Sequence, residues 1–139
     1  MGPNGAGKST LSAVVMGKPG YVVIAGYVTL IDDDGVESDV LAMPTWQRAQ
    51  AGLHLVMQYP TEVPGVLLVD VMEQALIARG RSTAGLDAQL TTESKRIGFD
   101  TALLHRALNV DLSGGEKKRN ETLQLAVLEP KIAILDELD

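Results

Sequence analysis

A glycine-rich pattern, G-x-x-x-x-G-K-[ST], opens the chain and narrows its possible folds at once. Glycines let the backbone turn tightly and bring several N–H groups toward phosphate oxygens, and the following helix directs its positive end at the same anion. Lys8 supplies a mobile positive charge, and the Ser9 hydroxyl can ligate Mg²⁺. A plain hairpin turn at Asn4-Gly5 is the weaker interpretation, because apolar helix residues follow almost directly. The pattern therefore predicts a phosphate-binding loop formed by Gly2, Pro3, Asn4, Gly5, Ala6, Gly7, Lys8 and Ser9.

Composition narrows the class of protein further. The 139 residues are 45% hydrophobic and 22% charged, which is typical of one globular domain with a buried core. The chain has no cysteine and therefore no disulfide or thiolate metal site. No apolar run reaches the length of a membrane span and no secretory leader is present, so we expect a cytoplasmic protein without membrane insertion. The net charge of −6 argues against nucleic acid as the main partner.

Periodicity and capping signals predict alternating helices and strands. Expected helices cover residues 9–16, 44–51, 66–79, 91–97, 101–107 and 114–128, with Asp100 and Ser113 as N-caps and Gly17 and Pro130 as stop signals. Expected β segments cover residues 21–31, 53–57 and 132–135. The acidic run Asp32-Asp33-Asp34 is interpreted as a solvated turn, because Met43 stands where a calcium loop would need its twelfth-position glutamate.

A second motif stands at the other end of the chain. The apolar strand Ile132–Leu135 leads directly into Asp136 and Glu137. Asp136 at a strand end would hold the Mg²⁺ shell, and Glu137 is placed to take a proton from an attacking water. The alternative interpretation is that two acids simply end a strand at a solvated loop, which is common. The phosphate loop in the same chain favours the functional interpretation.

The segment Leu112-Ser113-Gly114-Gly115-Glu116 adds a third motif. Ser113 and Glu116 form a capping-box pattern, but an ordinary helix start does not require Gly114 and Gly115, which cost helix stability. Two glycines leave the backbone amides uncovered, so a phosphate could approach this helix start from outside. The order of phosphate loop, Gln58, this segment and the acid-ending strand resembles that of ABC-type ATPases.

The resemblance extends to one family within that class. Residues 58–66 and 112–121 are similar to the SufC family, the ATPases of the SUF iron–sulfur cluster assembly machinery. The continuation Glu-Lys-Lys-Arg-Asn-Glu after the two glycines is characteristic of that family rather than of transporter subunits. The similarity spans nearly the whole chain and is weakest from about residue 80 to residue 110.

The resemblance implies an α/β fold of the P-loop NTPase, ABC ATPase type. It implies a mostly parallel sheet core, a small antiparallel β segment and a helical subdomain, with the core at residues 1–65 and 111–139 and the subdomain at about 66–110. It implies ATP and Mg²⁺ as cofactors and a second copy, paired head-to-tail, as partner. The further partner is a scaffold of the SufB and SufD type, which docks from residue 62 onward.

The same resemblance assigns roles to individual residues. Lys8, Ser9 and Thr10 contact phosphate and Mg²⁺, and Gln58 completes the metal shell with Ser9 and Asp136. The catalytic set is Glu137, Lys8 and Gln58, and the nucleotide of the second copy is contacted in trans by Ser113, Gly114 and Gly115.

Three other functions remain to be weighed. A nucleotide-binding subunit of a membrane transporter shares every catalytic motif and differs in its partner. A DNA-repair or chromosome-structuring ABC protein is disfavoured, because long coiled coils would separate the motifs. A non-catalytic binding module is the third.

Both ends of the chain depart from the family pattern. Only Met1 precedes Gly2, where a buried strand normally stands, and the chain stops at Asp139, where the D-loop should begin. His54 and His105 are misplaced for the switch histidine. We therefore expect a fragment of a longer gene product, which alone binds ATP weakly and hydrolyses it negligibly.

Overall fold

The computed structural model describes residues 2–57 and 59–136, and these residues pack into two compact units. The first unit contains residues 2–55 and 131–136, and the second contains residues 56–130. This grouping reflects packing alone, so the domain boundaries expected from the sequence stay a prediction.

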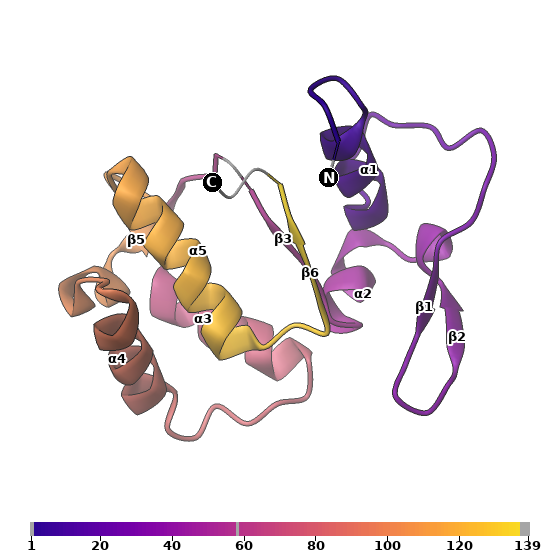
Figure 1. Cartoon of the computed structure of the whole chain (residues 1–139). Coiled ribbons are helices and arrows are strands. Elements are labelled where there is room, and N and C mark those ends of the chain that lie inside the picture. The colour runs from indigo at the N-terminus through magenta and orange to yellow at the C-terminus, as the bar shows by residue number, and fades with distance from the viewer. Residues whose placement is uncertain (1, 58, 137–139) are drawn as a thin grey trace. The chain divides into compact units, whose positions relative to one another are not determined.

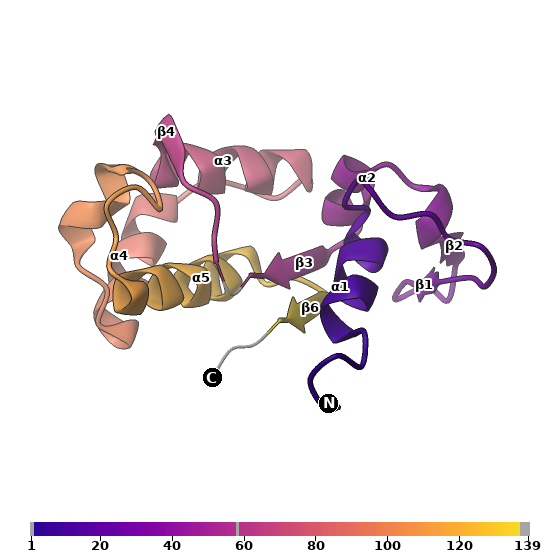
Figure 2. The same cartoon turned by 90° about the horizontal axis from the view of Figure 1, so that it is seen from above.

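The first unit combines two helices, a parallel strand pair and a small hairpin (Figure 1). Strands β3 and β6 are neighbours that run in the same direction in Figure 2, and the Ile132 amide donates to the Gly52 carbonyl at 3.1 Å. Strands β1 and β2 pair antiparallel, with Leu30 opposite Ser38. The elements are α1 (Lys8–Met16), β1 (Thr29–Ile31), β2 (Glu37–Asp39), the 3₁₀ turn η1 (Val40–Ala42), α2 (Thr45–Gln50), β3 (Leu53–Val56) and β6 (Ile132–Leu135).

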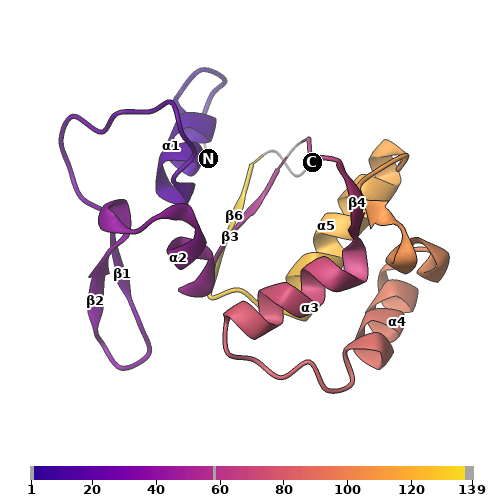
Figure 3. The same ribbon diagram turned by 180° about the vertical axis from the view of Figure 1, so that it is seen from behind.

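The second unit is mainly helical, and its three helices gather around one apolar core (Figure 3). Its elements are β4 (Val63–Leu67), α3 (Leu68–Ala78), α4 (Leu86–Ile97), the 3₁₀ helix η2 (Thr101–His105), β5 (Ala107–Leu108) and α5 (Gly114–Leu128). Strands β4 and β5 pair antiparallel, with Val63 opposite Leu108. The buried core consists of Leu68, Met72, Leu76, Leu86, Leu90, Phe99, Leu103, Leu104, Leu123, Val127 and Leu128. The predicted α/β class, with a parallel pair and small antiparallel strands, is confirmed.

Local signals placed several boundaries correctly. Helix α1 ends at Gly17, whose φ of 75° is in the left-handed region that glycine adopts without strain. Helix α5 begins after Ser113 and ends at Leu128, two residues before Pro130. The acidic turn is also confirmed, because the Asp32 carboxylate accepts from the amides of Asp34 and Val36 at 3.0 and 2.8 Å.

Other expectations were wrong in extent or in type. Of the β segment expected at 21–31, only Thr29–Ile31 forms a strand, and Val22 and Ile24 are 89% and 97% exposed. A strand needs a hydrogen-bonded neighbour, and residues 21–28 pair with no strand among the described residues. Their β-rich composition was therefore a poor guide.

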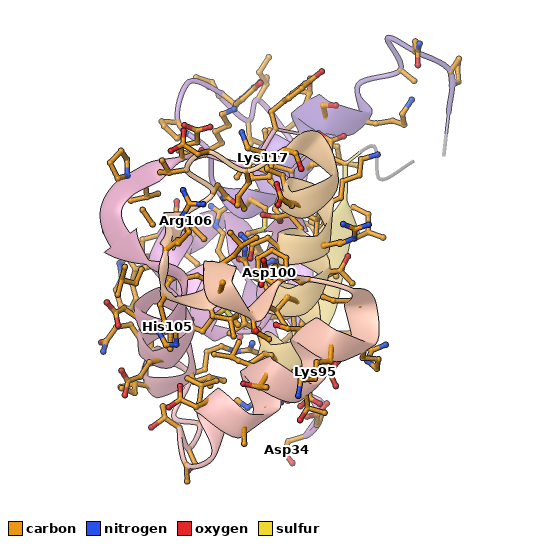
Figure 4. All side chains as sticks on the ribbon, turned by 90° about the vertical axis from the view of Figure 1, so that its left-hand side faces the viewer. Asp34, Lys95, Asp100, His105, Arg106 and Lys117 are labelled. Carbon is orange, nitrogen blue, oxygen red and sulfur yellow. The ribbon has the colours of Figure 1, made fainter. Side chains whose placement is uncertain are left out.

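In the second unit, the helix expected from residue 91 begins at Leu86, because Leu86 and Leu90 both face the core. The expected helix at 66–79 begins two residues later, since Val63–Leu67 pairs as β4. The segment expected as a helix at 101–107 is a five-residue 3₁₀ helix, capped by Asp100 as predicted and ending at His105 (Figure 4). Among residues 2–57 and 59–136, no helix combines the length and apolar character that a membrane span requires.

Candidate functional site

The glycine-rich loop leads directly into helix α1. Gly5 and Gly7 have φ values of 82° and 83°, and a Cβ built on either glycine would meet nothing within 4 Å. The backbone conformation, rather than lack of space, therefore requires glycine there. Gly7 is also the N-cap residue of α1, and no side chain of the described residues caps this helix. The first-turn amides of α1, which include those of Ser9 and Thr10, lack the usual side-chain acceptor and can serve an anion.

The Lys8 side chain folds over this loop. Its ammonium donates to the carbonyls of Gly2 and Pro3 at 2.6 and 3.0 Å. The Ala6 amide donates to the Pro3 carbonyl at 3.2 Å. These bonds hold the loop curled around the Lys8 ammonium. All of the predicted phosphate contacts from Gly2 to Thr10 lie on this loop and on the first turn of α1.

Ser9 and Asp136 bring the two ends of the chain together within the first unit. The Ser9 hydroxyl donates to the Asp136 carboxylate at 2.9 Å, although the residues are 127 positions apart. Helix α1 presents Ser9, and strand β6 ends immediately before Asp136. A hydroxyl and a carboxylate oxygen side by side are hard oxygen ligands of the kind that Mg²⁺ prefers. Gln58 and Glu137, which were predicted to complete this site, lie outside the described residues.

The third motif forms the start of α5 in the second unit. Ser113 and Glu116 make a complete capping box: the Glu116 carboxylate accepts from the Ser113 amide at 2.7 Å and from its hydroxyl at 2.6 Å. The Glu116 amide donates back to the Ser113 hydroxyl at 3.3 Å. The hydrogen bonds from Ser113 lower the pKa of Glu116 below its ordinary value.

Gly114 and Gly115 follow in the first turn of α5 and are unexplained by the fold of this chain. Neither has a positive φ, and a Cβ on either would meet nothing within 4 Å. Alanine at these two positions would favour the helix, by at most the difference of about 1 kcal/mol each that applies in a helix interior. The missing side chains therefore leave open space above the amides at a cost in helix stability.

Sequence reasoning missed a set of polar contacts that bind the segment after residue 58 to α5. The Asn109 amide group donates to the Thr61 carbonyl at 2.9 Å and, through its oxygen, accepts from buried Asn120 at 2.7 Å. Lys117 pairs with Glu62 at 2.8 Å. Asn109 has a φ of 60°, which asparagine tolerates better than most residues. The sequence offers one hint of these contacts, the asparagine Asn120 on the buried face of α5. No other local pattern indicates them.

Glu121 was missed as well. Glu121 lies on α5 and is only 5% exposed, and its carboxylate accepts a hydrogen bond from the Met57 backbone. Burial disfavours the charged carboxylate and raises the pKa of Glu121 to about 7, although the hydrogen bond acts in the opposite direction. Glu121 ends a run of mostly charged residues, 116–121, so the sequence gives no signal that this one glutamate is buried.

Comparisons with known proteins agree with this arrangement. A family model described as ABC transporter matches residues 1–138. "Vegetative protein 296" of Bacillus subtilis is 49% identical over 144 residues, which cover 100% of this chain and 53% of that protein. A "probable ABC transporter ATP-binding protein" of Streptococcus pyogenes is 45% identical and covered to 54% by the whole of this chain. For the "probable ATP-dependent transporter ycf16" of Pyropia yezoensis, the identity is 45% and the coverage 56%.

The chain spans about half the length of the curated relatives that it matches. The family match nevertheless covers almost every residue, from the glycine-rich loop through β6 and Asp136. The chain therefore belongs to the ABC transporter family and represents part of its ATP-binding domain.

Proposed function

We propose that this chain is the nucleotide-binding part of a SufC-type ATPase, which hydrolyses ATP with Mg²⁺ to drive iron–sulfur cluster assembly on a SufB–SufD type scaffold. The observation that carries the nucleotide site is the 2.9 Å hydrogen bond between Ser9 and Asp136. It joins the helix behind the phosphate loop to the acid at the end of β6, as a site for a phosphate-bound cation requires.

Residues 2–10 bind the phosphates in this proposal. Their support is the uncapped N-terminus of α1, the two left-handed glycines and the Lys8 ammonium held over the loop. The oxygen donors of Ser9 and Asp136 fit Mg²⁺, and Gln58 is the third proposed ligand. Bound Mg²⁺ would neutralise charge that develops on the phosphate oxygens.

Glu137 is the proposed general base, since it follows Asp136 directly at the end of the apolar strand. Ser113, Gly114 and Gly115 are the proposed contacts to a nucleotide bound by a second copy paired head-to-tail. Their support is that neither torsion angle nor space within this chain requires the two glycines.

Two kinds of partner compete in this proposal. The continuation of α5 after the glycines, Glu116 to Glu121, favours a SufC-type protein and its scaffold. A membrane transporter is the second candidate, favoured by the names of the relatives from S. pyogenes and P. yezoensis. The nucleotide site is the same in both.

The catalytic part is tested with the full-length gene product, wild type against Glu137→Gln. We expect Mg²⁺-dependent ATPase activity in the wild type, and retained ATP binding with lost turnover in the variant. Glu73→Gln, an exposed change on α3, is the matched control and should leave turnover unchanged. Unchanged turnover in Glu137→Gln would exclude this residue as the base.

The partner is tested by affinity purification of the tagged full-length gene product from its own organism. Co-purification of two soluble scaffold subunits that carry an iron–sulfur cluster supports the SufC assignment. Co-purification of a subunit with several membrane spans would replace it by the transporter assignment, with the nucleotide site unaffected.

A further inference from the structure

Arg48 is a buried charge in the first unit that pairs with no carboxylate among the described residues. The residue lies on α2 and is only 6% exposed. A buried cation is costly unless its donors are satisfied, so the partners of its guanidinium explain why the residue is tolerated.

Within residues 2–57 and 59–136, every partner of the Arg48 guanidinium is a backbone carbonyl. Its Nη1 donates to the carbonyls of Val14 and Val15, both at 2.8 Å. Its Nε donates to the Met43 carbonyl at 2.9 Å, and its Nη2 reaches the Leu41 carbonyl at 3.3 Å. Val14 and Val15 belong to the last turn of α1, whose carbonyls an α-helix leaves without regular intrahelical partners. The Val14 carbonyl also accepts from the Gly17 amide at 3.1 Å, so Arg48 adds a second bond there.

A neighbouring side chain of α2 completes the contact with α1. The Thr45 hydroxyl donates to the Gly17 carbonyl at 3.0 Å. A Cβ on Gly17 would come within 2.9 Å of the Arg48 Cζ, so this glycine permits the close approach of the guanidinium. Helix α2 thus holds the C-terminal end of α1 through Arg48 and Thr45.

The opposite end of α1 is the phosphate loop. The helix has nine residues and is therefore about 13 Å long. Because a helix this short moves as a rigid rod, fixing its C-terminal carbonyls also fixes the direction of its N-terminal amides. A guanidinium at the C-terminus additionally offsets the negative end of the helix dipole.

We propose that Arg48 is a positioning residue of the phosphate site, which fixes the direction of α1 toward the bound phosphates through its bonds to Val14 and Val15. The planar fork is essential, because Arg48 bonds four carbonyls from three separate nitrogens, whereas a lysine ammonium has only three donors on a single atom. This inference rests on the proposed ATP site, and the experiment below separates the failure of one from the failure of the other.

The test compares Arg48→Lys, Arg48→Met and the control Gln47→Ala in the full-length gene product. Gln47 is an exposed neighbour on the same helix. Arg48→Lys keeps the charge but loses the fork, and it remains informative if Arg48→Met does not fold. The readouts are the Kd for MgATP of the folded protein, the urea midpoint, and hydrogen exchange of the Leu11 amide, which donates to the Gly7 carbonyl at 2.9 Å.

We expect Arg48→Lys to weaken MgATP binding by about tenfold or more and to accelerate exchange at Leu11, with Gln47→Ala unchanged in both. A lower urea midpoint with unchanged Kd and unchanged Leu11 exchange would overturn the inference, because that result describes a purely structural arginine. If the wild type fails to bind MgATP, the proposed function is wrong. In that case Leu11 exchange alone decides whether Arg48 positions α1.

Discussion

Replacing Glu121 by glutamine is expected to remove a pH dependence that the wild-type fold contains. Burial on α5 raises the pKa of Glu121 from 4.5 to about 7, so the folded protein holds this proton more tightly than the unfolded chain. The stability that the group contributes is therefore complete below pH 4.5. It is lost as the pH rises through about 7, because the unfolded chain ionises first.

The magnitude follows from the two pKa values. They differ by about 2.5, and each pKa unit corresponds to about 1.36 kcal/mol, so the upper limit lies between about 3 and 4 kcal/mol. Glutamine has nearly the same shape and can still accept the hydrogen bond from the Met57 backbone, but it carries no charge at any pH. The difference in free energy of unfolding, Glu121→Gln minus wild type, should rise by about 2–3 kcal/mol between pH 4.5 and pH 8.

The assay is urea unfolding of both full-length proteins at several pH values in this range. Subtracting the two curves removes the contributions of all other titrating groups, which the variants share. Glu116→Gln on the same helix is the control with the opposite sign: the pKa of Glu116 is lowered, so its contribution is present above pH 4.5 and lost as the pH falls. Its difference curve should be flat from pH 6 to pH 8.

A flat difference curve for Glu121→Gln across pH 5–8 would refute the reasoning. It would mean that the carboxylate is solvated in the folded state, contrary to the burial of Glu121.

Three further changes have expected outcomes. Gly52→Ala should destabilise the fold by more than about 1 kcal/mol in urea unfolding, since φ is 103° and the new Cβ would come within 2.8 Å of Lys131. Gly114→Ala should raise the free energy of unfolding by up to about 1 kcal/mol while lowering ATPase turnover; a variant that is more stable and fully active would contradict the proposed contact with the nucleotide of a second copy. Asn120→Ala should cost about 1–3 kcal/mol in the same unfolding assay, because the Asn109 oxygen then lies buried without its donor; a loss below about 0.5 kcal/mol would contradict this.

The sequence predicted best what neighbouring residues decide. Ser113 and Glu116 form their capping box within a single turn, and Pro130 lies just past the end of α5, so this helix could be placed without its surroundings. Residues 21–28 show the opposite case: their apolar, β-branched character was real, but strand formation depends on a neighbour that local composition cannot supply.

In the candidate site, too, the sequence indicated some residues and gave no signal for others. The motifs singled out Ser9 and Asp136, since hydroxyl and acid each lie in a recognisable spacing, and the structure brings the two side chains within 2.9 Å. Arg48 could not be found by such reasoning, because its partners are main-chain carbonyls and every residue type offers the same carbonyl. Burial of Glu121 was equally hidden, since it depends on how α5 packs rather than on the residues beside it.

The proposed phosphate site can be ordered and still have donors and acceptors left for a ligand. The Lys8 ammonium has three donors, and in the described residues two are used on the carbonyls of Gly2 and Pro3. The Ser9 hydroxyl donates its one hydrogen to Asp136, and its lone pairs stay available for a cation. A phosphate can therefore accept the third Lys8 donor, and a metal can approach Ser9, without breaking these bonds. Because the loop need not be reorganised, most of the interaction energy with a nucleotide is available as affinity.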